Sequence, residues 1–292
     1  FYLLNDKGEN SSKMIPFFSI IGGWWKYLFY IVMINFLGYR YSAKHEKKYF
    51  CLAILLFLFS TYLILGTSRW AIIFHFVVTF YLFRIIFNRT LVKKLLVFVP
   101  LFVCLFFLIT IYKFQNDLGS DYSLINFADL FVSQLQDYFS GPSLIGHAID
   151  MGHKYNITFE TCWNDFVGAI PLLSKTVDQM NRTNILFNQY VISPDTEWFT
   201  QIIPATGLGY IYFGSMFAPI FTVVFNILGL HFDYKLLNTS NLFVKYVLIY
   251  CSLWGGLSIC FNTQIPFGNV VVYIFPLYLF YRLFSKLTIK LA

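Results

Sequence analysis

Charged side chains are scarce in this chain. They make up only 12% of its 292 residues, whereas hydrophobic residues reach 58% and aromatic residues 22%, and the mean hydropathy is +0.64. Soluble domains carry about 25% charged residues, because polar side chains must separate the apolar interior from water. The composition therefore excludes a water-soluble enzyme and a disordered segment, and it predicts a membrane protein with several spans.

Cysteine is also sparse and scattered. Four of the five cysteines lie inside apolar runs, and the fifth, Cys162, stands alone in the longest polar stretch. Cys251 and Cys260 share one expected helix and are separated by roughly 13 Å along its axis, which is too far for a disulfide. The sequence therefore predicts no disulfide framework.

Long apolar runs, in contrast, are plentiful. Crossing a hydrocarbon core of about 30 Å takes roughly 17 to 25 helical residues, and seven runs qualify: about Gly22–Tyr39, Tyr49–Gly66, Trp70–Phe87, Leu95–Tyr112, Gly207–Leu230, Leu242–Phe261 and Ile265–Tyr281. We expect an all-α fold, a polytopic transmembrane helix bundle with one large, partly helical external loop. Residues 1–112 would hold three or four spans, residues 113–206 the external catalytic loop, and residues 207–292 three spans and a cytoplasmic tail.

The basic residues are unevenly divided between the two sides of this expected bundle. If the seven spans alternate, one side holds thirteen of them: Arg40, Lys44, Lys47, Lys48, Arg84, Arg89, Lys93, Lys94, Lys235, Lys245, Arg282, Lys286 and Lys290. The opposite short segments hold only Lys7, Lys13 and Arg69. Because short cytoplasmic loops are enriched in Lys and Arg, the long loop should be external or periplasmic. The net charge of +7 then reflects topology, and no nucleic-acid partner is expected.

The long loop at residues 113–206 is expected to be folded. Connections of this length are commonly functional or disordered. Apolar residues recur at helical spacing from Leu124 to Tyr138, which predicts an amphipathic helix. Ser140-Gly141-Pro142 then predicts the start of a second helix, and Gly152 its end.

Acidic residues are missing from all seven expected spans. Ten of the fourteen lie in residues 113–206 instead. Proton- or ion-coupled transporters normally carry a carboxylate inside the membrane, because charge there is costly and is kept for function. The distribution therefore argues against coupled transport and favours an enzyme that acts on a lipid-anchored substrate from an external platform.

Two arginines are candidates for binding phosphate. Arg69 lies in a tight external hairpin between two expected spans, and Arg182 is the only arginine of the long loop. Arginine presents a permanent forked charge that matches phosphate oxygens. The simpler interpretations are an interfacial anchor for Arg69 and a solvated side chain for Arg182. His75, in the helix that follows Arg69, is expected to be a hydrogen-bonded packing residue.

The loop also supplies candidates for proton transfer and for sugar binding. His147, Asp137 or Glu197 could take a proton from a sugar hydroxyl, although each alone is expected to be a surface residue. Loop aromatics could stack on sugar rings or pack in the core; they are Tyr138, Trp163, Tyr190 and Trp198.

No metal site is expected. His147, Asp150 and His153 lie close together in sequence, but Gly152 should end the helix before His153. No carboxylate or cysteine cluster completes a ligand set.

Four features occur in order along the chain: Thr67-Ser68-Arg69 opening a span, one very long external loop, Tyr138-Phe139-Ser140-Gly141-Pro142 after an amphipathic helix, and Tyr210-Ile211-Tyr212-Phe213-Gly214 entering the next span. Together they resemble the oligosaccharide repeat-unit polymerases of bacterial capsule and O-antigen assembly, the Wzy family. Such polymerases usually have more than seven spans, and this chain begins with Phe1 rather than Met. The resemblance therefore implies their C-terminal portion.

The resemblance implies a metal-independent, inverting glycosyltransferase of the cell membrane, without cofactor or nucleotide sugar. The donor would be a growing glycan on undecaprenyl pyrophosphate, and the acceptor a repeat unit on the same carrier. A loop base would deprotonate the acceptor hydroxyl, while Arg69 and Arg182 would stabilise charge on the departing pyrophosphate. Implied partners are lipid-linked oligosaccharide and membrane lipids, with a flippase and a chain-length regulator as further ones.

Three other functions stay open. An O-antigen ligase, which moves the same glycan onto lipid A core, shares the long loop and the arginines. A flippase or transporter of lipid-linked sugars should show inverted repeats and interrupted helices, and no internal repeat is evident in the sequence. A non-catalytic membrane scaffold should tolerate removal of the loop charges.

Overall fold

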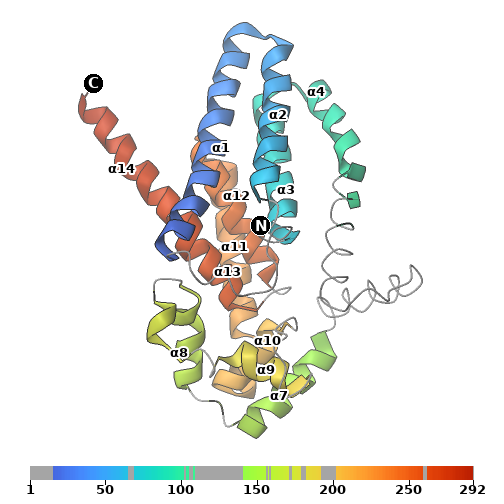
Figure 1. The fold of residues 1–292 in the computed structure, drawn as a ribbon, viewed down its shortest axis with the longest axis vertical. Coiled ribbons are helices and arrows are strands. Elements are labelled where there is room, and N and C mark those ends of the chain that lie inside the picture. Colours follow the sequence, from blue (N-terminus) through green and yellow to red (C-terminus); the bar gives the residue numbers. More distant parts are fainter. Residues whose placement is uncertain are drawn as a thin grey trace. The chain divides into compact units, whose positions relative to one another are not determined.

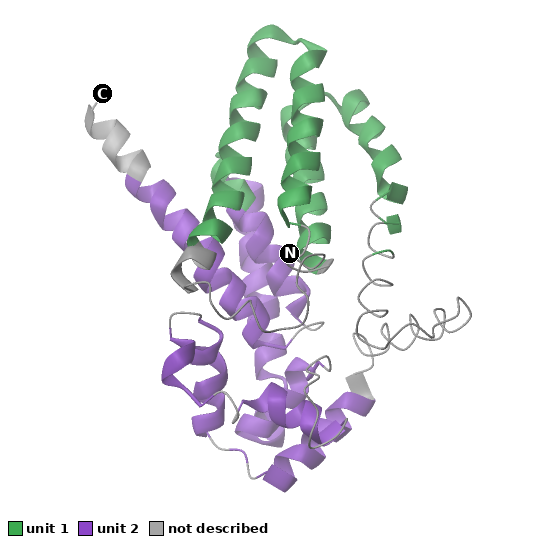
Figure 2. Ribbon diagram, in the orientation of Figure 1, with its two compact units in different colours: residues 1–127, 240–246 green, residues 128–239, 247–292 purple. Residues whose placement is uncertain are grey.

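The chain folds into helices. The computed structural model describes residues 16–64, 69–101, 103–104, 108, 141–155, 157, 159–170, 173–178, 182–191, 202–258 and 262–291. Every regular element within these ranges is helical, as the sequence predicts (Figure 1). The chain divides into two compact units, one of residues 1–127 and 240–246 and the other of residues 128–239 and 247–292 (Figure 2).

The first unit is a stack of antiparallel helices. Its elements are α1 (Pro16–Lys44), α2 (Lys47–Ile64), α3 (Arg69–Ile86), α4 (Arg89–Lys93) and the 3₁₀ turn η2 (Lys94–Val97). The turn between α1 and α2 is short because His45 adopts a positive φ of 53°. The N–H of His45 donates to Tyr41 O over 2.7 Å, which satisfies a carbonyl at the end of α1.

Polar side chains join α1, α2 and α3 inside the first unit. Tyr30 OH lies 2.7 Å from Thr79 Oγ1, and Ser60 Oγ lies 2.6 Å from His75 Nε2. The His75 side chain is buried, and its ring lies 4.6 Å from that of Tyr30 and 5.4 Å from that of Phe57, centroid to centroid. The packing role expected of His75 is confirmed.

The second unit holds the described part of the long loop and the C-terminal helices. Its elements are α7 (Gly141–Tyr155), α8 (Phe159–Gly168), η3 (Ser174–Thr176), α9 (Thr183–Val191), α10 (Ala205–Phe213), η4 (Ser215–Phe217), α11 (Ile220–Asn238), most of α12 (Leu242–Gly256), α13 (Gln264–Asn269), the π-helical turn η6 (Val270–Ile274) and α14 (Phe275–Leu291). Helix α7 packs on α9 and α10, and α8 packs on α9 and α13. The amphipathic helix expected from Leu124 to Tyr138 lies outside the described residues.

Helix α7 is longer than the sequence predicts. It begins at Gly141, as Pro142 suggests, but it continues through Gly152 to Tyr155, so the expected stop at Gly152 is wrong. The glycine serves packing instead: a Cβ at Gly152 would lie 3.4 Å from Ile211 Cγ1 in α10. A Cβ at Gly207 in α10 would in turn lie 2.9 Å from Ala148 Cβ. Small residues on both helices therefore allow the two backbones to approach closely.

Three described stretches are long and apolar enough to cross a membrane: Lys47–Ile64, Ser215–Asn238 and Gln264–Leu283. Shorter apolar helices at Trp70–Ile86 and Leu242–Gly256 fall on the third and sixth expected spans. The first expected span lies within α1, which is not among the span-length candidates, and most of Leu95–Tyr112 lies outside the described residues. The chain is a membrane protein on this evidence of length and composition.

The fifth expected span, Gly207–Leu230, is not a single helix. Helix α10 ends at Phe213, and Gly214 then adopts a φ of 79°, a conformation that costs glycine little because it has no Cβ. Helix α11 starts only after Pro219. The span-length stretch is therefore displaced toward the C-terminus and begins at Ser215.

This displacement brings a carboxylate into a candidate span. Helix α11 runs past Leu230 to Asn238 and so contains Asp233, whose carboxylate accepts a hydrogen bond from Ser252 Oγ of α12. Asp233 therefore lies in a span-length stretch, although none of the seven expected spans contains an acidic residue. Asp233 weakens the argument against coupled transport that rests on the acidic residues.

Helices α11 and α12 cross at two glycines. A Cβ on Gly255 would lie 2.9 Å from Gly229 Cα and 3.1 Å from Phe225 O. Small residues allow such close approach between helices in a membrane. A Cβ on the adjacent Gly256 would meet no atom within 4 Å, so this residue provides a matched control.

Replacing Gly255→Ala should destabilise the protein by about 1–3 kcal/mol, because the new methyl group overlaps the α11 backbone. Gly256→Ala should change stability by less than about 0.5 kcal/mol. Thermal unfolding of both purified variants in detergent measures the difference. Equal midpoints for the two variants would contradict the close approach of α11 and α12 at Gly255.

Candidate functional site

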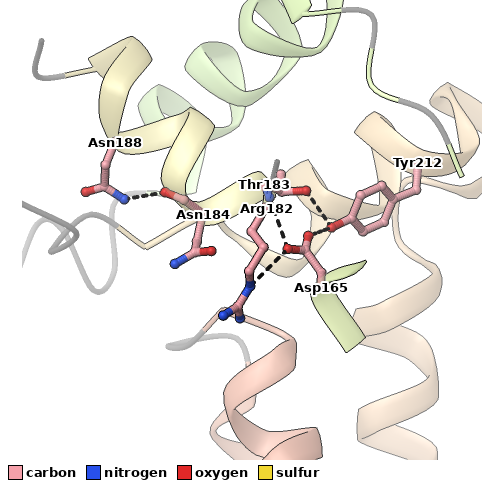
Figure 3. A network of polar contacts seen from close by, with 6 residues as sticks. All are labelled: Asp165, Arg182, Thr183, Asn184, Asn188 and Tyr212. Carbon is pink, nitrogen blue, oxygen red and sulfur yellow. Dashed lines mark hydrogen bonds and ion pairs between the residues drawn. The ribbon is translucent and has the colours of Figure 1, made fainter. Parts of the chain in front are cut away.

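A buried carboxylate organises the polar part of the second unit. Asp165 lies in α8 and its side chain is 0% exposed. Its Oδ1 accepts the Thr183 N–H over 3.0 Å, and its Oδ2 accepts the Tyr212 hydroxyl. The Nε atom of Arg182 lies 3.8 Å from Oδ1. Figure 3 shows the Arg182, Thr183 and Tyr212 side chains gathered around this one carboxyl group.

The network links the ends of three helices. Thr183 is the first residue of α9, so Asp165 places a carboxylate at the N-terminus of that helix, where unpaired N–H groups and the helix dipole favour an anion. Thr183 Oγ1 also lies 2.8 Å from Tyr212 OH in α10. Because the Tyr212 hydroxyl donates to Asp165, it accepts from Thr183, and the three side chains form one continuous chain of hydrogen bonds.

A glycine makes room for Arg182. A Cβ at Gly168, the last residue of α8, would lie 3.3 Å from Arg182 Nε and 3.4 Å from Arg182 Cζ. The guanidinium therefore lies against the C-terminal end of α8, where a positive charge is favoured by the helix dipole. The Arg182 side chain is 20% exposed, so it is held by Asp165 but still reaches the surface.

Burial controls the protonation of this cluster. It raises the pKa of the Asp165 carboxyl above its ordinary value of 3.8, while hydrogen bonds from Thr183 and Tyr212 and the charge of Arg182 oppose the rise. Burial, together with the neighbouring Asp165, raises the pKa of Tyr212 well above 10. The Tyr212 phenol therefore keeps its proton at neutral pH and remains a donor.

Cys162 lies one turn before Asp165 on α8 and is buried. Burial and then the Asp165 charge raise the pKa of its thiol to about 11. A thiol that is both buried and protonated reacts slowly with alkylating reagents. The next residue, Trp163, is 59% exposed, and it offers the better position for a surface label.

The structure brings together few of the residues that the sequence singles out. Arg182 is part of the Asp165 network, and His147 is exposed on α7. Helix α3 begins at Arg69, but the Arg69 side chain lies outside the described part of the chain. Four further candidates also lie outside it: Asp137, Tyr138, Glu197 and Trp198. Their roles stay predictions.

His147, Asp150 and His153 all lie on α7 because that helix continues past Gly152. All three are exposed. His153 Nε2 lies 3.4 Å from Tyr210 OH, and the His147 ring lies 6.5 Å from that of Tyr190. Within the described ranges, no three His, Cys, Asp or Glu side chains come close enough to hold a metal ion.

Three members of the network, Asp165, Thr183 and Tyr212, are not among the site residues predicted from the sequence. Asp165 is one of ten acidic loop residues, and Tyr212 stands in a run of aromatics at the expected entry of a span. Nothing in the sequence indicates a contact between Asp165 and Tyr212, because 47 positions separate them and only the packing of the folded chain brings them together.

Comparisons with models of protein families, with curated proteins and with solved structures found no match for this chain. The chemistry of the site therefore has to be inferred from its geometry.

The raised pKa of Asp165 predicts a definite pH dependence. The folded protein holds this proton more tightly than the unfolded chain, so the stabilising contribution is complete below about pH 3.8 and is lost as pH rises through the folded-state pKa. The free energy of unfolding of the wild type minus that of Asp165→Asn should therefore fall as pH rises from about 4. Denaturation of both proteins in detergent between pH 4 and 8 measures this difference in the free energy of unfolding. A difference that grows with pH would contradict a raised pKa at Asp165.

Proposed function

We propose that this chain is a membrane glycosyltransferase that polymerises oligosaccharide repeat units carried on undecaprenyl pyrophosphate, on the outer face of the cell membrane. Support comes from the three span-length helices and from a helical segment, α7 to α9, that lies between apolar stretches in the sequence. Further support comes from the basic residues, which gather in alternate connections of the seven spans expected from the sequence. The protein would need neither metal nor nucleotide sugar.

The observation that carries the proposal is the placement of Arg182. A buried carboxylate and the end of α8 hold its guanidinium, while 20% of the side chain stays exposed. A permanent cation fixed in this way can meet a phosphate at the surface without first being ordered. Such a group suits a reaction in which charge develops on a departing pyrophosphate.

The proposed reaction forms one bond to the anomeric carbon and breaks another. A base takes the proton of an acceptor sugar hydroxyl, whose oxygen bonds to the anomeric carbon of the donor glycan. The bond from that carbon to the pyrophosphate oxygen breaks, and undecaprenyl pyrophosphate leaves with the electron pair. Arg182 and, in the same proposal, Arg69 stabilise the leaving group. Of the candidate bases, only His147 is among the described residues, and it is exposed on α7.

One observation favours a transporter of lipid-linked sugars as second candidate. Asp233 lies within the candidate span Ser215–Asn238 and bonds to Ser252, as a coupling carboxylate would. Asp233 is exposed, however, and Lys235 follows at the same end of the helix, which suits the edge of a membrane better than its middle. The polymerase therefore remains the first candidate function.

The proposal requires residues 141–191 to face outward. A single cysteine introduced as Trp163→Cys, with the native cysteines replaced by serine, should react with an impermeant thiol reagent on intact cells. Lys93→Cys, exposed in the connection expected to be cytoplasmic, should react only after permeabilisation. Labelling of Lys93→Cys on intact cells, with Trp163→Cys protected, would reverse the topology and exclude the proposed reaction.

Arg182→Ala should stop chain growth. We expect a roughly 100- to 1,000-fold loss of transfer, typical for removal of a group that stabilises developing charge, and surface glycan reduced to single-repeat products on a gel. Lys175→Ala removes an exposed cation elsewhere in the second unit and should leave the ladder unchanged.

The amount of protein in the membrane controls for misfolding of Arg182→Ala. Arg182→Lys preserves the charge beside Asp165 but not the forked donors, and it should give shortened chains at normal protein level. A full ladder from both Arg182 variants would reject the proposal. Transfer of glycan only to lipid A core by the wild type would identify a ligase instead.

A further inference from the structure

Helices α7 and α9 gather two tyrosines, a lysine and a histidine at one place on the second unit. Lys154 Nζ lies 5.4 Å from the ring centroid of Tyr155 and 5.2 Å from that of Tyr190. The two tyrosine rings are 6.5 Å apart and nearly perpendicular, at 83°. The His147 ring lies 6.5 Å from that of Tyr190. We call these four residues, His147, Lys154, Tyr155 and Tyr190, the tyrosine–lysine surface.

The core fixes this surface. Tyr155 and Tyr190 are half-buried and pack against the cluster of buried residues that contains Met151 and Phe187. His147 and Lys154 are exposed and lie two helical turns apart on α7. The rings are therefore anchored before any ligand arrives, and only the Lys154 side chain would have to be ordered, which limits the entropic cost of binding.

The polar groups of this surface have few partners among the described residues. Lys154 makes no ion pair there, although the exposed Asp150 lies one turn earlier on α7. Neither Tyr155 nor Tyr190 makes a hydrogen bond through its hydroxyl within the described ranges. The ammonium group instead lies over two aromatic rings, a contact worth about 0.5–2 kcal/mol in general, so its N–H donors stay available to an anion.

This combination matches the chemistry of a charged sugar. The C–H face of a sugar ring is apolar and can pack on an anchored tyrosine ring, and its hydroxyls can bond to phenol and imidazole groups. A carboxylate on the sugar would pair with Lys154. A lipid phosphate would pair with Lys154, but it has no apolar face that could pack on the two tyrosine rings.

We propose that the tyrosine–lysine surface binds an acidic sugar, one that carries a carboxylate, within the glycan substrate. The inference rests on the proposed function and names the substrate class of that reaction. It also places His147, a candidate base, beside the bound ring.

Binding can be measured without any transfer reaction. The full-length chain, purified in detergent, would be titrated by calorimetry with tetramers of galacturonic acid and of glucuronic acid. Tetramers of the uncharged parent sugars, galactose and glucose, would be titrated in parallel. Glycerol phosphate, a mimic of a lipid headgroup, would be tested as well. We expect saturable binding of an acidic tetramer and at least tenfold weaker binding of its uncharged counterpart. Glycerol phosphate should not compete.

Two substitutions locate the binding to this surface. Lys154→Gln should remove the preference for the acidic tetramer, and Tyr190→Ala should weaken binding at least tenfold. Because Tyr190 also packs on the core, Tyr190→Phe provides a variant with intact packing that should bind only a few-fold more weakly. The matched controls are Lys175→Gln and Phe159→Ala, an exposed lysine and an exposed aromatic residue elsewhere in the second unit, which should bind like the wild type.

Several results would overturn the inference: no saturable binding of either acidic tetramer, equal binding of the uncharged ones, or wild-type selectivity in Lys154→Gln. Competition by glycerol phosphate would instead identify a headgroup site. The proposed function can fail separately: a protein that binds acidic tetramers without building polymer contradicts only the polymerase. Conversely, a polymerase that ignores acidic sugars contradicts only this inference.

Discussion

The cost of removing a carboxylate from water governs how α8, α9 and α10 are joined in the second unit. Asp165 has no exposed side-chain surface, and a buried carboxyl group is tolerated only when its oxygens are matched by donors or charge. Here α9 provides a backbone N–H, α10 a phenol and the residue before α9 a guanidinium. Three successive α-helices, α8, α9 and α10, are thereby tied to one group. The position of Arg182, on which the proposed chemistry depends, follows from the same requirement.

Local patterns predicted much of the helical architecture. The apolar run Tyr49–Gly66 corresponds to α2, Lys47–Ile64, and Pro142 correctly marks the start of α7. The errors arose where backbone geometry overrides hydropathy. An average over apolar residues does not register the positive φ of Gly214, so hydropathy predicts a fifth span that begins earlier than the span-length stretch at Ser215. Gly152 predicts a helix end, but α7 continues through it, and the missing side chain allows α7 to approach α10 closely.

The candidate site was harder to predict because its members meet only through tertiary packing. Arg182 was identifiable as the only arginine of the long loop, which is a property of sequence alone. Its partner Asp165 and the donor Tyr212 were not, since neither the spacing nor the neighbours of these residues signal a contact between α8, α9 and α10. Similarly, Tyr190 and Lys154 are remote in sequence, and their cation–π contact depends on the seam between α7 and α9.

If Asp165 acts on the reaction through Arg182, the two residues must be energetically coupled in chain growth. The most direct measurement is a double-mutant cycle on the purified protein, supplied with one defined lipid-linked repeat unit, comparing the wild type, Asp165→Asn, Arg182→Ala and the double variant. The account predicts polymer from the wild type and a double variant no slower than Arg182→Ala alone, because Asp165 has nothing left to position. Losses that multiply in the double variant, or a wild type that makes no polymer, would contradict it.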